Sequence, residues 1–215
     1  MTHRLAVLIS GTGSNLQAII DAIANRQLDA RIALVISNKP GVAGLDKAAA
    51  AGIPTAVFRH LDYPDRETFD RAMARALDAV SPDTVVLAGF MRILSPWFVK
   101  RYEGRLINIH PSLLPRYPGL NTHQRALDAG DKEHGCSIHF VNDDLDGGPI
   151  IAQYRISVDA NDSERTLSER VQTAEHQLYP KVLQWRAEAR LLLSATGVIL
   201  DDAPLPPTGR LFPQT

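Results

Sequence analysis

The sequence has almost no cysteine, almost no net charge and no long hydrophobic run. Its 215 residues include one cysteine, Cys136, and carry a formal net charge of -1. A lone cysteine excludes an intrachain disulfide, which fits a reducing cytosol, and the balanced charge gives no general attraction to nucleic acid. No apolar run approaches the length of a membrane span, and the first residues show no signal-peptide architecture. We therefore expect a cytoplasmic protein that binds neither nucleic acid nor a membrane.

The first half of the chain alternates between apolar strand signals and helix signals. Strands are predicted at 5–9, 32–36, 55–58, 84–88 and 106–110, and helices at 16–23, 43–51 and 66–80 and at a short segment opened by Pro96. This alternation predicts right-handed crossovers and an open, mostly parallel α/β sheet of the Rossmann-like kind, with helices on both faces. Ligands of such sheets bind beyond the carboxyl ends of the strands.

The second half changes character but shows no linker that would divide the chain. Strands are predicted at 136–141 and 149–154, a long helix at about 163–189, and a hairpin from 190–193 and 198–200. Residues 205–215 are rich in proline and are expected to form a loose tail. A length of 215 residues suits one large domain, so we expect residues 1–215 to form a single domain.

The segment after the fifth strand, NIHPSLLP at 108–115, combines an amide, an imidazole and a stiff backbone. Residues two apart share one face of a strand, so Asn108 and His110 are expected to point the same way at the carboxyl edge. Pro111 favours an extended His110, and the nearby prolines stiffen the loop. Such a pair can stabilise developing negative charge, although a buried structural histidine is the simpler interpretation of Asn-x-His alone.

The turn at 11–15 lies between the first strand and the first helix and is suited to a phosphate. Its glycines let the backbone approach closely, and the free amides of a helix N-terminus bind anions. A dinucleotide fingerprint would need a third glycine where Leu16 stands and an acid after the second strand, where Ser37, Asn38 and Lys39 stand. A single phosphate monoester therefore fits better, with a purely structural turn as the alternative.

The acidic segment 142–148 resembles a calcium loop only in part. Asn142, Asp144, Asp146 and Gly147 fall at suitable positions, but the bidentate glutamate is replaced by Gln153. We expect no calcium here, and the histidine spacings predict no zinc site. Asp146, followed by two glycines, is the best candidate to face His110 and favour its protonated form; a solvated turn is the alternative.

Several motifs in this order resemble the folate-dependent formyltransferases. They are ISGTGSNLQ at 9–17, AGFMRIL at 88–94 and NIHPSLLP at 108–115. YPGL at 117–120 with His123, LDGGP at 145–149 and VQTAEH at 171–176 narrow the resemblance to the branch that acts on a purine-pathway ribonucleotide. The resemblance covers nearly the whole chain up to about residue 193.

The resemblance implies transfer of the formyl group of 10-formyltetrahydrofolate, the co-substrate, to the amine of 5'-phosphoribosylglycinamide. The products would be formylglycinamide ribonucleotide and tetrahydrofolate, in the de novo synthesis of purines. No metal and no partner beyond small-molecule substrates is implied, and the enzyme would be a monomer or a homodimer. Residues 1–110 would hold the nucleotide phosphate, 111–195 the folate and the catalytic groups, and 196–215 would be a tail.

The same resemblance assigns residues to three groups. The catalytic trio would be Asn108, His110 and Asp146. The ribonucleotide would be bound by Gly11, Thr12, Gly13, Ser14, Asn15, Gln172 and Glu175. The folate would be bound by Arg66, Phe90, Met91, Arg92, Ile93, Leu94, Asn108, His139, Val141, Asn142, Asp143, Asp144 and Leu145.

Related activities compete with this interpretation. Methionyl-tRNA formyltransferases share the Asn-x-His core, but we expect no room here for their tRNA-binding domain. Formyltetrahydrofolate hydrolases share the core too and carry a regulatory domain that we do not expect here. A folate- or nucleotide-binding protein without catalysis is a third alternative, against which the complete catalytic trio argues.

Overall fold

The computed structural model describes residues 2–212 of the chain. Within this range, eight strands form one sheet in the order β11-β7-β6-β5-β4-β1-β2-β3. Their bounds are β1 (His3–Ile9), β2 (Ala30–Ser37), β3 (Thr55–Val57), β4 (Thr84–Leu87), β5 (Leu106–His110), β6 (Glu133–Phe140), β7 (Ile150–Ser157) and β11 (Arg210–Phe212). The expected open, mostly parallel sheet is confirmed, with β6 as an exception that runs antiparallel to both β5 and β7.

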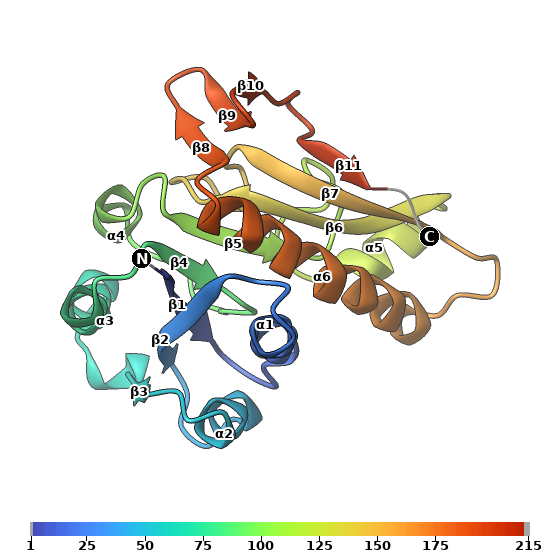
Figure 1. The fold of residues 1–215 in the computed structure, drawn as a ribbon. Coiled ribbons are helices and arrows are strands. Elements are labelled where there is room, and N and C mark those ends of the chain that lie inside the picture. Colours follow the sequence, from blue (N-terminus) through green and yellow to red (C-terminus); the bar gives the residue numbers. More distant parts are fainter. Residues whose placement is uncertain (1, 213–215) are drawn as a thin grey trace.

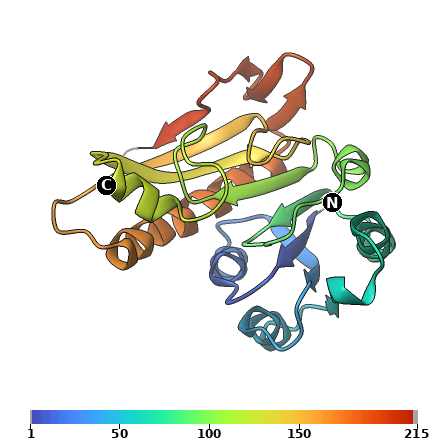
Figure 2. The same ribbon diagram turned by 180° about the vertical axis from the view of Figure 1, so that it is seen from behind.

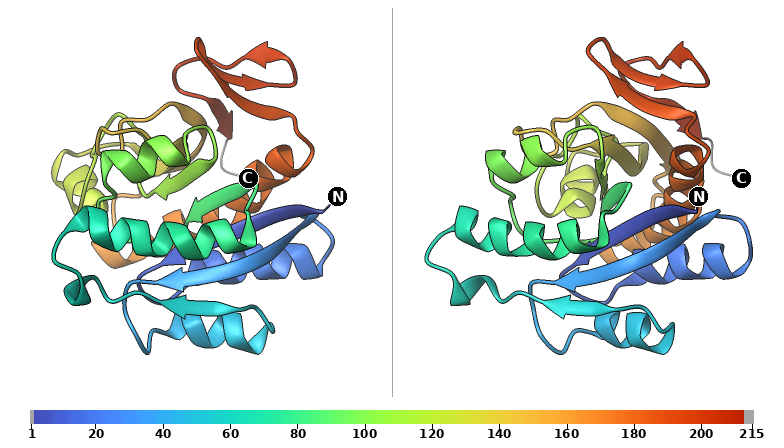
Figure 3. Two further views of the ribbon diagram at one scale, coloured as in Figure 1. Left: turned by 90° about the vertical axis from the view of Figure 1, so that its left-hand side faces the viewer. Right: turned by 60° about the vertical axis from the view of Figure 1, so that its left-hand side comes forward.

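Helices cover both faces of this sheet (Figure 1). Their bounds are α1 (Ser14–Ala24), α2 (Ala43–Ala50), α3 (Arg66–Val80), α4 (Pro96–Arg101), α5 (Thr122–Asp128) and α6 (Glu164–Ala187). A 3-10 turn, η1 (His60–Asp62), precedes α3. Figure 3 shows α3 and α4 on one side of the strands and α6 on the other.

Strand β1 shows why both faces must be covered. All five residues from Leu5 to Ile9 are apolar and fully buried. Because side chains alternate along a strand, Leu5, Val7 and Ile9 belong to the core under α1 and α6, while Ala6 and Leu8 belong to the core under α3 and α4. The continuous apolar run therefore marks a central strand, and its carboxyl end leads directly into the glycine turn.

The expectation of a loose tail at 205–215 is wrong for the part that the structure describes. Strand β11 pairs in parallel with β7 and extends the sheet, and residues 213–215 lie outside the described range. The ring of Phe212 stacks on Tyr154 of β7 and on Trp185 of α6, with centroid separations of 6.4 and 6.1 Å. This long-range aromatic contact stabilises a segment whose prolines predict no regular structure.

Two further elements differ from the expectation. Helix α5 was not predicted, because its seven residues begin directly after the proline-rich loop and show little helical periodicity. The predicted hairpin near 190–200 is present as β8 (Leu191–Ser194) and β9 (Gly197–Leu200), and β10 (Ala203–Pro204) adds a third strand. Seen from behind, this small sheet stands beyond the β7 side of the main sheet (Figure 2).

Candidate active site

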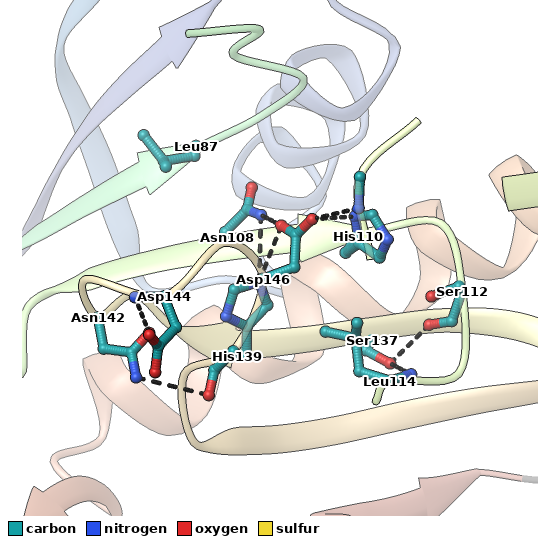
Figure 4. A network of polar contacts seen from close by, with 12 residues as sticks. Leu87, Asn108, His110, Ser112, Leu114, Ser137, His139, Asn142, Asp144 and Asp146 are labelled. Atoms are coloured by element: carbon teal, nitrogen blue, oxygen red, sulfur yellow. Dashed lines mark hydrogen bonds and ion pairs between the residues drawn. The ribbon is translucent and has the colours of Figure 1, made fainter. Parts of the chain in front are cut away.

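Asn108 and His110 meet the same carboxylate at the carboxyl end of β5. The Asp146 side chain lies between them (Figure 4). Its Oδ2 is 3.3 Å from His110 Nδ1, and its Oδ1 is 3.5 Å from Asn108 Nδ2. Side-chain exposure is 7% for His110 and 10% for Asp146, so this contact is largely shielded from water. The alternation of β5 aligns Asn108 and His110, and the loop between β6 and β7 brings Asp146 to them, so the three predicted catalytic side chains form one cluster.

The second nitrogen of the His110 ring is also engaged. His110 Nε2 lies 2.9 Å from the carbonyl oxygen of Tyr117. A carbonyl only accepts, so Nε2 carries a hydrogen, while Nδ1 faces a carboxylate that also accepts. A ring protonated on both nitrogens satisfies both contacts at once.

His139 fixes the amide of Asn108 from the neighbouring strand. The β5–β6 register places Asn108 opposite His139, and Asn108 Nδ2 is 3.1 Å from His139 Nε2. His139 Nδ1 donates to the carbonyl of Phe140 at 2.9 Å, and burial lowers the pKa of His139. The ring is therefore neutral, with Nε2 as an acceptor, and one of the two amide hydrogens of Asn108 points at it.

The loop that carries Asp146 has a defined shape. Asp146 has a φ of 51°, and its Oδ2 accepts a hydrogen bond from the backbone N–H of Gly119 at 2.9 Å. The Asn142 side chain accepts from the backbone N–H of Asp144 at 3.1 Å, which makes a tight turn. A Cβ on Gly148 would come within 1.8 Å of the Phe140 carbonyl oxygen, so only glycine fits there.

A buried polar cluster holds the segment between His110 and Tyr117. Ser137 of β6 donates to the Ser112 carbonyl at 2.6 Å and accepts from the Leu114 N–H at 3.0 Å (Figure 4). Gln153 of β7 donates to both Ser137 Oγ and the Leu114 carbonyl, each at 2.8 Å. These bonds fix the loop that presents the Tyr117 carbonyl to His110.

The glycine turn gives α1 an open N-terminus. Gly13 occupies the N-cap position with a φ of 67°, and among residues 2–212 no side chain caps the first amides. A Cβ on Gly13 would lie 2.7 Å from the Cα of Gly44, because the turn packs directly against the first turn of α2. The uncapped amides are therefore available to an anion.

Two hydrogen bonds join this turn to α6. Asn15 Nδ2 donates to Glu175 at 2.8 Å, and Gln172 Nε2 donates to Ser14 Oγ at 3.1 Å. Burial raises the pKa of Glu175 to about 7, against the lowering effect of the Asn15 hydrogen bond. The structure thus brings together four of the predicted ribonucleotide residues, Ser14, Asn15, Gln172 and Glu175. Thr12, on the same turn, is exposed.

The loop after β4 holds five of the thirteen predicted folate residues, Phe90, Met91, Arg92, Ile93 and Leu94. Ser10 accepts from the Met91 N–H at 2.8 Å and donates to Asn38 at 2.6 Å, which ties this loop to the ends of β1 and β2. Phe90 and Leu94 are buried, whereas Met91 and Ile93 are 67% and 56% exposed. Arg66 lies on another element, in the first turn of α3.

Sequence reasoning missed several groups that shape these sites. The Tyr117 carbonyl and the Gly119 amide are backbone atoms, and the only hint of them is the turn signal in YPGL. A hollow of about 830 Å³ between α1 and α6 begins at Ser14 and is also lined by Lys47 and His176, which were given no role. Within residues 2–212, no group of three His, Cys, Asp or Glu side chains is placed to hold a metal ion.

Comparison with known proteins places these features in a family. The formyl transferase family model matches residues 3–183. Phosphoribosylglycinamide formyltransferase of Escherichia coli is 53% identical over 205 residues, covering 95% of this chain and 97% of that protein. The human trifunctional purine biosynthetic protein adenosine-3 is 52% identical over 196 residues, which are 91% of this chain and 19% of that protein.

The fold is equally close to solved structures. Phosphoribosylglycinamide formyltransferase of Coxiella burnetii superposes with a TM-score of 0.96 at 49% identity, covering 99% of this chain and all of that one. Glycinamide ribonucleotide transformylase 1 of Symbiobacterium toebii gives a TM-score of 0.89 at 40% identity, over 93% of this chain and 94% of that one.

Proposed function

The chain belongs to the formyl transferase family, and on that premise we propose that it transfers a formyl group from 10-formyltetrahydrofolate to the amine of 5'-phosphoribosylglycinamide. The products are formylglycinamide ribonucleotide and tetrahydrofolate. The convergence of Asn108, His110 and Asp146 at one point carries this proposal, because acyl transfer to an amine passes through a tetrahedral oxyanion that needs donors.

Asn108 supplies one donor to that oxyanion. Its amide nitrogen has two hydrogens, and His139 accepts one of them at 3.1 Å. The second points at Asp146 across 3.5 Å, at the limit of a hydrogen bond. This second hydrogen is therefore the one that the reacting oxygen can take.

His110 supplies the other donor as an imidazolium. The Tyr117 carbonyl holds Nε2–H, so Nδ1–H is the hydrogen that Asp146 shares with the oxyanion. Asp146 stabilises the imidazolium charge and orients the ring. The same carboxylate accepts a hydrogen bond from the Gly119 amide, which connects the donor and its counter-ion to the loop at 117–119.

The reaction balances without a further reactant. The acceptor amine forms a C–N bond to the formyl carbon, and the bond from that carbon to the folate nitrogen breaks. One proton leaves the amine and one arrives on the folate nitrogen, carried by water or by His110. Tetrahydrofolate leaves with the electron pair of the broken bond.

The acceptor is held from its phosphate end. The uncapped amides at Gly13, Ser14 and Asn15 bind the phosphate, with Gly11 and Thr12 completing the turn. Glu175, linked to Asn15, contacts the sugar or the amine end of the ribonucleotide, and Gln172 supports Ser14.

The folate lies along the loop after β4. Residues 90–94 line the pterin slot through backbone groups and the exposed apolar side chains of Met91 and Ile93. The 141–146 loop closes over the ring, and Arg66 meets the acidic tail. We place this reaction in the cytosol, in a monomer or a homodimer that acts on small molecules.

A two-substrate assay tests the proposal. Purified protein is incubated with 10-formyltetrahydrofolate, with and without the ribonucleotide, and tetrahydrofolate and formylated ribonucleotide are measured separately. Transfer predicts equal amounts of both products and no tetrahydrofolate when the acceptor is omitted. Tetrahydrofolate without acceptor would indicate hydrolysis instead, and binding of both ligands without any product would indicate a binding protein.

A further inference from the structure

The loop that carries the folate residues is fixed at two backbone amides. At one end Ser10 accepts from the Met91 N–H at 2.8 Å. At the other end the Ser95 N–H donates to Asp70 Oδ2 at 2.6 Å. The residues between these two points are Arg92, Ile93 and Leu94, so their positions depend on both contacts.

Asp70 is an unusual residue for its location on α3. Its side chain is fully buried, and its neighbours along the helix, Phe69, Met73 and Leu77, belong to the apolar core on that face of the sheet. Its Oδ1 is buried with no hydrogen-bond partner among the described residues, and burial raises the pKa of the carboxyl. A buried carboxylate costs free energy, so packing between α3 and α4 alone would favour an apolar side chain here.

Both arginines of the folate site act on this carboxylate. Arg66 stands four residues before Asp70, on the same face of α3, and Arg92 belongs to the loop. The positive charges of both arginines partly offset the rise that burial causes in the pKa of Asp70. The Nε of Arg92 is buried without a partner among residues 2–212.

We propose that Asp70 is a positioning residue for the folate co-substrate, which holds the far end of the 91–95 loop through the Ser95 amide. The inference rests on the proposed function, because it takes the loop to be the folate slot. It assigns a purpose to a carboxylate that touches neither reacting group. Without this acceptor, the segment between Met91 and Ser95 keeps one fixed end and loses its shape.

The chemistry of the contact predicts which substitutions matter. Asp70→Asn keeps a carbonyl oxygen that can accept from the Ser95 N–H, whereas Asp70→Ala removes the acceptor. We expect Asp70→Ala to weaken binding of tetrahydrofolate about tenfold, while the KM for the ribonucleotide changes less than about twofold. Asp70→Asn is expected to restore folate binding to within about threefold of the unsubstituted protein.

Tetrahydrofolate binding is measured by calorimetry, and both KM values come from the two-substrate assay. Asp78→Ala is the matched control, because Asp78 lies two turns later on α3 and joins it to α4 through Arg101 and Tyr102. It tests loss of an α3–α4 contact without touching the loop. Equal weakening of folate binding in Asp78→Ala, or equal weakening of both substrates in Asp70→Ala, overturns the proposal.

A second pair of variants serves if Asp70→Ala fails to fold. The backbone φ of Ser95 is -74°, which proline adopts, so Ser95→Pro removes the donor N–H and Ser95→Ala removes only the hydroxyl. Weaker folate binding in Ser95→Pro than in Ser95→Ala supports a role for the hydrogen bond from the Ser95 N–H to Asp70, and equal binding overturns the proposal. Formyl transfer by the unsubstituted protein tests the proposed function separately from these comparisons.

Discussion

The His110 ring has an acceptor on each side, and this determines what its removal should do. The Tyr117 carbonyl orients the ring and Asp146 balances its charge, while Asn108 is oriented separately by His139. The two donors also share Asp146, and in the proposed mechanism they stabilise one oxyanion together. Their loss should therefore affect the transition state and leave ground-state binding largely intact.

We predict that Asn108→Ala and His110→Ala each lower kcat by roughly 10²–10³, the usual effect of one lost donor. The double variant should lose less than the product of the two single losses, because residues that act as a unit are not additive. Both dissociation constants should change little. The measurements are kcat, both dissociation constants and Tm for all three variants. Retained turnover in a fully folded His110→Ala would remove this residue from the mechanism.

Glu175 gives a pH prediction with a definite sign. Its pKa is raised by burial from 4.5 to about 7, so between these values the folded state holds a proton that the unfolded state releases. The stabilising contribution of the neutral carboxyl is complete below about pH 4.5 and is lost as pH rises through about 7. The full change in the free energy of unfolding is roughly 3 kcal/mol, because each unit of pKa shift corresponds to about 1.36 kcal/mol.

Glu175→Gln keeps a neutral side chain at all pH values and still accepts from Asn15. We expect the variant and the unsubstituted protein to have similar Tm values at pH 5, and the variant to be the more stable at pH 8. Thermal unfolding of both proteins at the two pH values measures this. A Tm difference that does not change with pH would contradict the raised pKa.

At the scale of elements, the shape of the glycine turn depends on α2. Gly44 lies within α2, where alanine ordinarily stabilises a helix by about 1 kcal/mol relative to glycine. A Cβ on Gly44 would meet Ile9 Cδ1 at 2.5 Å and the Gly11 carbonyl oxygen at 3.0 Å. The first contact is with a side chain that can shift, whereas the second is with the backbone of the turn.

We therefore predict that Gly44→Ala raises the KM for the ribonucleotide several-fold and leaves the KM for the folate near its original value. Steady-state kinetics with each substrate varied in turn measures the two constants. Ala48→Gly, a buried position one turn further along α2, is the control for a general disturbance of the helix. If the control raises the ribonucleotide KM to the same extent, the close contact between Gly13 and Gly44 does not matter.

The same scale shows what the sequence can and cannot predict. The central strands are evident from apolar runs, because a strand buried on both faces has no polar positions. The shared orientation of Asn108 and His110 is evident from strand alternation and proline stiffening. Helix α5 and strand β11 cannot be predicted in this way. The seven residues of α5 follow a proline-rich loop, and the three residues of β11, which end at Phe212, depend on contacts with distant segments. The roles of the Tyr117 carbonyl and the Gly119 amide cannot be predicted from residue type, because these backbone groups are present in almost every residue.

At the scale of the whole molecule, buried and half-buried histidines set the response to acid. Burial lowers the pKa of five histidines, His3, His123, His134, His139 and His176. Burial lowers the pKa of His134 from 6.5 to about 4. The Nε2 of this ring lies 3.1 Å from His123 Nδ1. Below about pH 6.5 the unfolded chain takes up protons that the folded protein excludes, so stability falls with pH and opposes the effect of Glu175.

We predict that Tm falls steadily from pH 6.5 to pH 4, because the combined destabilisation from the five histidines exceeds the stabilisation that Glu175 contributes as the pH falls. His134→Gln should flatten this slope, since its share amounts to roughly 3 kcal/mol over that interval. Thermal unfolding across the range measures both slopes. Parallel curves for the variant and the unsubstituted protein would show that His134 is not the group responsible.

Strand β11 has a consequence for how the chain is made. Its partner β7 is synthesised earlier, and α6 and the small three-stranded sheet are made between the two strands. Until residues 210–212 have left the ribosome, the outer edge of β7 has unpaired backbone groups, which are a template for association with other chains. A chain that terminates before residue 210 therefore keeps Asn108, His110 and Asp146 but leaves the outer edge of β7 open to association with other chains.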